Sequence, residues 1–120
     1  MRHEILIVED DADIRIALEE IIEDHGFQAV GVRHGQEALD YLAGAAELPC
    51  LIVLDLMMPV MDGASFRDAQ LRDARIASIP VVVLSAYRDI DRRALGLGAV
   101  SVLGKPPSVS ELLKVLRTHC

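Results

Sequence analysis

The chain has 120 residues, enough for one domain with its own hydrophobic core and too few for two. Hydrophobic residues make up 52% of it, yet no run approaches the roughly 20 apolar residues that cross a bilayer, and the amino terminus lacks the features of a secretory signal. The net charge of −7 argues against a nucleic-acid-binding surface, which needs clustered Lys and Arg. We therefore expect a single domain over residues 1–120 that is cytoplasmic and contacts neither nucleic acid nor membrane directly.

The two cysteines, Cys50 and Cys120, have neither the spacing of metal ligands nor the pattern of a disulfide framework. This usage suits a reducing cytoplasm. Both residues are interpreted as structurally neutral.

The amino-terminal part predicts a strand followed by a helix. A β-branched run at residues 5–8 is typical of a strand, and Glu9, Asp10 and Asp11 follow it directly. The next segment has the periodicity of a helix and stops at Gly26. Its apolar stripe consists of Ile14, Leu18, Ile21 and Ile22. Ile16 falls on the opposite side of this helix, so we expect it to be exposed.

The middle of the chain repeats this alternation. Strands are predicted at residues 29–32 and 51–54, with a helix between them and another after Gly63. The apolar face of the first of these helices consists of Ala38, Leu39 and Leu42. The strand at residues 51–54 ends in the carboxylate of Asp55. Taken alone, Asp55 would be interpreted as an ordinary strand-end turn residue.

Two further strands, at residues 81–84 and 100–103, flank a weaker helical segment at residues 88–95. Ser85 follows the first of these strands and Lys105 the second. The last helix begins at a capping box, in which Ser108 and Glu111 can satisfy each other's free backbone donors. The residues that we expect this helix to bury are Leu112, Val115 and Leu116.

Apolar strands separated by helices predict a doubly wound α/β domain, with a parallel sheet covered by helices on both faces. Ligands bind such sheets outside the carboxyl ends of the strands, where four of the five predicted strands carry polar residues. Each has an ordinary alternative, because Asp11 or Asp13 could cap the first helix and Lys105 could be a solvated loop lysine. Their coincidence at one edge favours a functional site.

The residue types at this edge indicate phosphoryl chemistry. The carboxylates of Glu9, Asp10 and Asp55 would repel one another without a cation, and a pocket of oxygen ligands without His or Cys suits Mg²⁺. Asp55 could then act as the nucleophile that forms an aspartyl-phosphate. The Lys105 ammonium and the Ser85 hydroxyl would stabilise the new phosphoryl oxygens.

Four motifs of the chain closely resemble those of the receiver domain of bacterial two-component response regulators, in order and spacing. They are ILIVEDD from residue 5, the stretch from Asp55 to Gly63, VVVLSA from residue 81 and GKP from residue 104. The resemblance covers nearly the whole chain. It implies a flavodoxin-like fold in which the five strands have the order 2-1-3-4-5.

The resemblance also implies roles for individual residues. Asp55 corresponds to the phosphoacceptor, and Glu9 and Asp10 to the acidic pair that holds Mg²⁺ together with Asp55 and the backbone carbonyl of Met57. Ser85 occupies the hydroxyl position and Lys105 the position of the family's lysine. The Lys105–Pro106 bond is expected to be cis, which an X–Pro bond tolerates.

Two departures from the family pattern bear on signalling. Val102 occupies the position of the aromatic residue whose rotation commonly reports phosphorylation, so we expect the signal to leave by another route. Met57 and Tyr87 flank the path of a hydrolytic water, and neither offers a carboxylate or amide to orient it. We therefore expect a long-lived phosphoryl group.

The resemblance implies a signalling module rather than an enzyme, with self-phosphorylation and autodephosphorylation as its only reactions. A histidine kinase or histidine phosphotransfer protein would supply the phosphoryl group to Asp55, with Ile16 as a candidate docking contact, and phosphorylation would alter the affinity for an unknown downstream protein. A homodimer through the fourth helix, fifth strand and fifth helix is compatible with this interpretation. So is a receiver segment of a longer response regulator or hybrid kinase.

Two other functional classes fit less well. A phosphatase of the haloacid-dehalogenase type also forms an aspartyl-phosphate, but it needs a second acid two residues after the nucleophile, where this chain has Met57. A flavodoxin-like nucleotide binder needs a Gly-rich or hydroxyl-rich loop after the first strand. The acids at that position would repel a bare phosphate.

Overall fold

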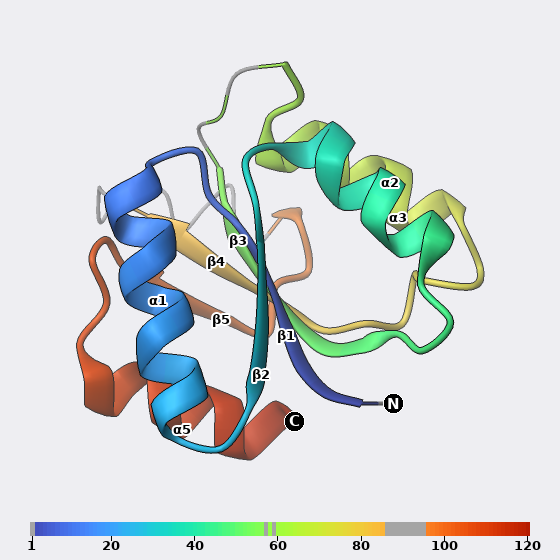
Figure 1. Cartoon of the computed structure of the whole chain (residues 1–120). Coiled ribbons are helices and arrows are strands. Elements are labelled where there is room, and N and C mark those ends of the chain that lie inside the picture. Colours follow the sequence, from blue (N-terminus) through green and yellow to red (C-terminus); the bar gives the residue numbers. More distant parts are fainter. Residues whose placement is uncertain (1, 57, 59, 86–95) are drawn as a thin grey trace.

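The structure is a computed structural model, and it describes residues 2–56, 58, 60–85 and 96–120. Helices and strands alternate along the described residues (Figure 1). They are β1 (Arg2–Val8), α1 (Ala12–Asp24), β2 (Gln28–Val32), α2 (Gly35–Gly44), β3 (Pro49–Asp55), α3 (Gly63–Arg72), β4 (Val81–Ser85), β5 (Ser101–Gly104) and α5 (Val109–His119). The helical segment predicted at residues 88–95 lies outside the described residues.

The five strands form one parallel sheet in the order β2-β1-β3-β4-β5, which confirms the predicted topology. The first four predicted runs lie inside strands, whereas the fifth, predicted at residues 100–103, is shifted by one residue because β5 begins at Ser101 and ends at Gly104. β1 begins earlier, at Arg2, because Arg2 pairs with Pro49 of β3 beyond an irregularity in the register. β3 and β4 extend to Asp55 and Ser85, because these residues pair with Leu84 and Gly104 of the neighbouring strands.

Helices cover both faces of the sheet, as predicted (Figure 1). On one face α1 and α5 enclose a hydrophobic cluster with the inward side chains of the central strands, and α2 and α3 enclose a second cluster on the other face. The residues expected to be buried in α5, namely Leu112, Val115 and Leu116, all lie in the first cluster. Ile16 on the outer side of α1 is 49% exposed, which confirms its predicted position.

Side chains before the first turn cap each of the described helices. Asp11 accepts backbone N–H bonds from Asp13 and Ile14 at the start of α1, so the capping interpretation of Asp11 is confirmed. Ser108 accepts from the Glu111 N–H at the start of α5. The sequence interpretation missed the cap of α2, where the ring of His34 accepts from the Glu37 N–H, because histidine is not among the preferred capping residues.

The interpretation of Cys50 and Cys120 as structurally neutral is wrong. The two residues form a disulfide, with 5.2 Å between their Cα atoms and a sequence separation of 70. Spacing alone could not reveal the pair, because the fold brings the start of β3 to the end of α5.

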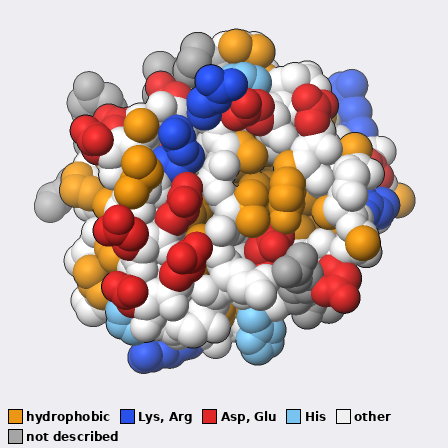
Figure 2. All heavy atoms as spheres, viewed as in Figure 1, with side chains coloured by type: hydrophobic (Ala, Val, Ile, Leu, Met, Phe, Trp, Pro, Cys, Tyr) orange, Lys and Arg blue, Asp and Glu red, His pale blue; other side chains and the backbone are white. Residues whose placement is uncertain are grey.

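No helix among the described residues is long and apolar enough to cross a membrane. On the face shown in Figure 2, Asp and Glu side chains gather over α1. This face is acidic, in keeping with the net charge of −7.

Candidate functional site

The carboxyl ends of the parallel strands bring the predicted site residues to one edge of the sheet. Glu9 directly follows β1, Asp55 ends β3, Ser85 ends β4 and Lys105 directly follows β5. The register places Asp55 beside Leu84, and Ser85 beside Gly104, the residue before Lys105. Residues that are far apart in the sequence therefore meet because all the strands run in the same direction.

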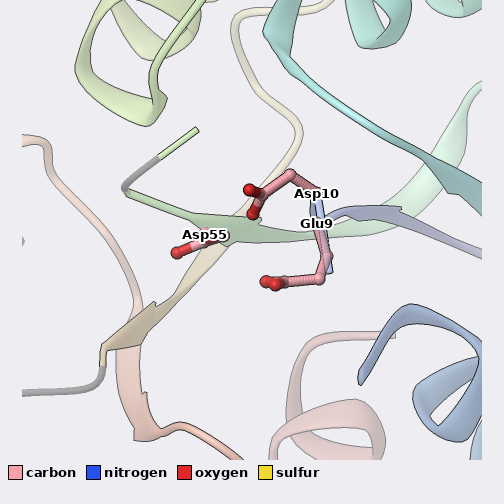
Figure 3. Close-up of side chains that lie close together, drawn as sticks. All are labelled: Glu9, Asp10 and Asp55. Atoms are coloured by element: carbon pink, nitrogen blue, oxygen red, sulfur yellow. The ribbon is translucent and has the colours of Figure 1, made fainter. Parts of the chain in front are cut away.

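Three carboxylates from two neighbouring strands meet at this edge. Glu9, Asp10 and Asp55 each place one carboxylate oxygen within 4.8 Å of the other two, and their side chains face a common space (Figure 3). Glu9 and Asp55 are buried, whereas Asp10 is exposed. The cluster therefore combines two desolvated acids with one that reaches solvent.

Lys105 joins two of these acids. Its Nζ atom lies 2.8 Å from Glu9 Oε1 and 2.9 Å from Asp55 Oδ2, and its side chain is only 17% exposed. The peptide bond between Lys105 and Pro106 is cis, as predicted. Burial alone would lower the pKa of Lys105, but the hydrogen bonds and charges of Glu9 and Asp55 outweigh it and raise that pKa. Lys105 is thus held as a cation between two acids.

Glu9 has a strongly perturbed environment. Burial raises its pKa from the ordinary 4.5 to about 7, and the negative charge of Asp55 adds to this, against the opposing effect of Lys105. One of its oxygens, Oε1, binds Lys105 and accepts the Asp11 N–H. The other, Oε2, is buried and accepts no hydrogen bond, which leaves a lone pair available for a cation.

The donor atoms of this cluster fit a hard divalent cation. All three side chains offer carboxylate oxygens and none offers nitrogen or sulfur, which matches the preference of Mg²⁺ for oxygen ligands. Among the described residues, Lys105 is the cation that pairs with these carboxylates, and its one charge does not balance three gathered acids. Most buried acceptor atoms in proteins accept a hydrogen bond, whereas Glu9 Oε2 accepts none from the described residues. This is an independent indication that a cation binds here.

The backbone around Glu9 is held from two sides. Its N–H donates to the carbonyl of Val32 in β2, and its own carbonyl accepts from Nη1 of Arg15 on α1 at 3.0 Å. Sequence reasoning missed Arg15, because a charged residue on a helix carries no local sign of this contact. These bonds orient the segment that carries Glu9 and Asp10.

The loop between β3 and α3 is shaped by close backbone contacts. A Cβ atom at Gly63 would lie 2.7 Å from the carbonyl oxygen of Asp55 and 2.8 Å from the Cα atom of Leu56, so only glycine fits there. Asp62 caps α3 by accepting the Ser65 N–H, at the start of the helix predicted after Gly63. Val60 has a φ of 65°, which is an uncommon backbone conformation for a β-branched residue. Its side chain is 81% exposed.

The remaining residues that the sequence singled out are Ser85, Val102, Met57 and Tyr87. Ser85 is 7% exposed, and Val102 of β5 is half-buried against the cluster under α2 and α3. Met57 and Tyr87 lie outside the described residues. The predicted carbonyl ligand and the predicted long lifetime of a phosphoryl group therefore stay predictions.

Known proteins are similar to this chain over nearly its whole length. The family model described as "Response regulator receiver domain" matches residues 5–117. The transcriptional regulatory protein PdtaR of Mycobacterium tuberculosis is 39% identical over 117 residues, which cover 93% of this chain and 54% of that protein. Sporulation initiation phosphotransferase F of Bacillus subtilis is 31% identical over 123 residues, covering 99% of this chain and 94% of that protein.

Among solved structures, chemotaxis protein CheY4 of Vibrio cholerae has a TM-score of 0.87 and 26% sequence identity, and the match covers 100% of both chains. The chain spans about half the length of the first curated relatives that it matches. The similarity to these longer proteins therefore concerns one segment of them.

Proposed function

The chain belongs to the family of response regulator receiver domains, and from this premise we propose that it is a phosphorylatable signalling module with Asp55 as its phosphoacceptor. The observation that carries the proposal is the contact of Lys105 Nζ with both Asp55 and Glu9 inside the acidic cluster. A lysine at this place can neutralise a phosphoryl group on Asp55, and the acids beside it can hold the metal that phosphoryl transfer needs.

In the proposed reaction an oxygen of the Asp55 carboxylate attacks the phosphorus atom of a phosphohistidine. The P–O bond to Asp55 forms as the P–N bond to the histidine breaks, and the histidine leaves with the electron pair of that bond. Lys105 then donates a hydrogen bond to one of the phosphoryl oxygens and the Ser85 hydroxyl donates to another. The buried position of Asp55 strengthens both interactions, because charges interact more strongly away from water.

We propose that Mg²⁺ binds to Glu9, Asp10, Asp55 and the backbone carbonyl of Met57. When bound, it supplies positive charge to the phosphoryl oxygens. The buried Oε2 atom of Glu9, which has no hydrogen-bond donor, supports this assignment.

The proposed phosphodonor is a histidine kinase or a histidine phosphotransfer protein in the cytoplasm. The name of the Bacillus relative, a phosphotransferase, supports a place in such a relay. Ile16, exposed on α1 next to the acidic segment, is the proposed apolar contact for the donor. The acidic surface over α1 (Figure 2) supports a protein rather than a nucleic acid as the partner.

We propose that the downstream protein, or a second copy in a homodimer, binds β5, α5 and the predicted fourth helix, which lies outside the described residues. A groove between β5 and α5 supports this, with Val100, Val102 and Val115 among its lining residues. Phosphorylation would act there without an aromatic reporter, because the reporter position is Val102. The transcriptional role named for PdtaR belongs to a protein of which this chain matches 54%, and we do not extend that role to this chain.

The proposed phosphoacceptor is tested by incubating the protein with Mg²⁺ and a small phosphodonor such as acetyl phosphate. We expect the intact mass to rise by one phosphoryl group, and hydroxylamine to remove it, because acyl phosphates react with this nucleophile. Asp55→Asn should abolish the mass increase. Asp24→Asn, which removes an exposed acid at the end of α1, serves as the matched control and should leave it unchanged. A hydroxylamine-sensitive adduct that survives in Asp55→Asn would assign the phosphoryl group to another residue.

A further inference from the structure

The disulfide between Cys50 and Cys120 lies at the edge of the sheet opposite the acidic site. Cys50 is the second residue of β3, whose last residue is Asp55, and Cys120 directly follows α5. The distance of 5.2 Å between their Cα atoms lies within the range that a disulfide spans without backbone movement. The pair therefore connects the end of α5 to the amino-terminal end of the central strand.

Apart from Cys120, the residues after Leu116 at the end of α5 make few contacts with the hydrophobic core. The buried residues Leu112, Val115 and Leu116 fix the earlier turns, whereas Arg117 and Thr118 are exposed. Beyond Leu116, Cys120 is the position that reaches the cluster under α1 and α5, where it packs on the cluster that contains Cys50. Breaking the covalent bond would leave this turn with backbone hydrogen bonds such as that from the Cys120 N–H to the Leu116 carbonyl.

The two sulfur atoms differ in access to solvent. Cys50 is 6% exposed, whereas Cys120 is half-buried. Thiol–disulfide exchange requires a thiolate to reach a sulfur atom. A small thiol will therefore attack the sulfur of Cys120 and release Cys50 as the leaving group.

We propose that Cys50 and Cys120 form a reversible thiol–disulfide switch that fastens and releases the last turn of α5. Its co-reactant is a low-molecular-weight thiol and its disulfide, such as the glutathione couple. On oxidation, the Cys120 thiolate attacks glutathione disulfide, forming a mixed disulfide and releasing one glutathione. The Cys50 thiolate then attacks the Cys120 sulfur and releases the second glutathione. The protein loses two protons and two electrons, equal to two hydrogen atoms, which the two released glutathione molecules carry.

This inference goes beyond the proposed phosphorylation and does not depend on it. Disulfides in a reducing compartment are usually transient and redox-sensing, so the cytoplasmic location proposed above favours a switch over a permanent crosslink. The groove between β5 and α5 is lined in part by Thr118 and His119, which belong to the turn that the disulfide fastens. Oxidation would therefore fix one wall of this groove.

The test equilibrates the whole chain with glutathione disulfide or with millimolar glutathione. We expect the oxidised protein to be lighter by two hydrogen atoms and to show a Cys50–Cys120 crosslink in peptide mass spectra. It should melt roughly 10 °C higher than the reduced protein, because the crosslink closes a long loop. Glutathione should restore the dithiol form, and amide exchange in residues 116–120 should then become at least about tenfold faster.

Cys120→Ser and Cys50→Ala are the matched controls, and the melting temperature of each should not respond to the glutathione couple. Glutathione disulfide should modify Cys120 in the Cys50→Ala variant much faster than it modifies Cys50 in Cys120→Ser. Failure of the crosslink to form would overturn the proposal, and so would equal melting temperatures of the two forms. A crosslink that millimolar glutathione cannot reduce would identify a permanent structural bond and would also overturn the switch.

Discussion

The charge state of Glu9 depends strongly on its surroundings. Its pKa is raised from 4.5 to about 7, mainly by burial, so the folded protein holds a proton on Glu9 over a pH range in which the unfolded chain does not. The stabilising contribution of this proton is complete below about pH 4.5 and is lost as the pH rises through about 7. In metal-free buffer, the free energy of unfolding should therefore fall over this range by up to roughly 3 kcal/mol.

Urea denaturation at several pH values, in the presence of a chelator, measures this slope. Glu9→Gln removes the titrating group and keeps its shape, so we expect this variant to lose most of the decrease between pH 4.5 and 7. Glu20→Gln changes the same charge on the exposed face of α1 and should keep the wild-type slope. A Glu9→Gln variant with an unchanged slope would assign the pH dependence to other groups.

The site residues could be predicted because each follows a recognisable strand. Glu9, Asp55, Ser85 and Lys105 were identified from their places after β-branched runs, and a parallel sheet necessarily brings such places together. The contact of Cys50 with Cys120 could not be predicted in this way. Their pairing depends on how far α5 extends across the sheet, and no local pattern records that distance.

At the scale of the elements, α3 is the helix that departs most from its expected composition. Its buried residues include Arg67 and Gln70 beside Phe66. Arg67 donates from Nε to the carbonyl of Leu97 at 2.8 Å and from Nη1 to Gln70 Oε1 at 2.7 Å. Because two of the inward positions are polar, apolar periodicity could predict that α3 exists but not which of its residues are buried.

The amide of Gln70 completes this network, since its Nε2 donates to the carbonyls of Ile76 and Ile79 at 2.9 and 3.0 Å. We predict that Gln70→Leu lowers the free energy of unfolding by about 1–3 kcal/mol, because Nη1 of the buried Arg67 and the carbonyl of Ile79 lose their bonds to the Gln70 amide. Adding Arg67→Leu removes the buried cation as well. The double variant should therefore lose less free energy of unfolding than the two single variants lose together, by roughly 1 kcal/mol or more.

Urea denaturation of the four proteins in this cycle gives the coupling energy. Arg72→Leu on the same helix is the matched control, because Arg72 pairs with Asp68 on the exposed side, where both side chains are more than half exposed. Its effect should stay within about 0.5 kcal/mol. Strictly additive single variants would show that Arg67 and Gln70 do not act as a network.

At the scale of the whole molecule, the acidic site lies apart from the two hydrophobic clusters that stabilise the fold. Both clusters lie on the sheet, one beneath α1 and α5 and the other beneath α2 and α3, whereas the acids lie beyond the ends of β1 and β3. This architecture could be predicted from the alternation of strands and helices, since few topologies satisfy it. Repulsion among the gathered acids therefore lowers the free energy of unfolding of the whole domain.

A cation that binds the acidic cluster should consequently stabilise the entire fold. Glu9 and Asp10 follow β1 and Asp55 ends β3, so unfolding separates the ligands and releases the ion. The stabilisation follows RT ln(1 + [L]/Kd), which is roughly 1.4 kcal/mol at ten times the Kd and about 2.7 kcal/mol at a hundred times. We predict that saturating Mg²⁺ raises the melting temperature by roughly 5–10 °C at neutral pH.

Thermal melts across a Mg²⁺ titration test this, with NaCl at matched ionic strength to separate binding from simple screening of the repelling acids. Asp10→Asn removes one carboxylate at the exposed mouth of the cluster, so the variant should melt no lower than the wild type without metal and should gain much less from Mg²⁺. Asp13→Asn removes an exposed acid three residues further along and should keep the full gain. If NaCl raises the melting temperature as much as Mg²⁺ does, the cluster repels charge without binding the ion, and the proposed metal site is wrong.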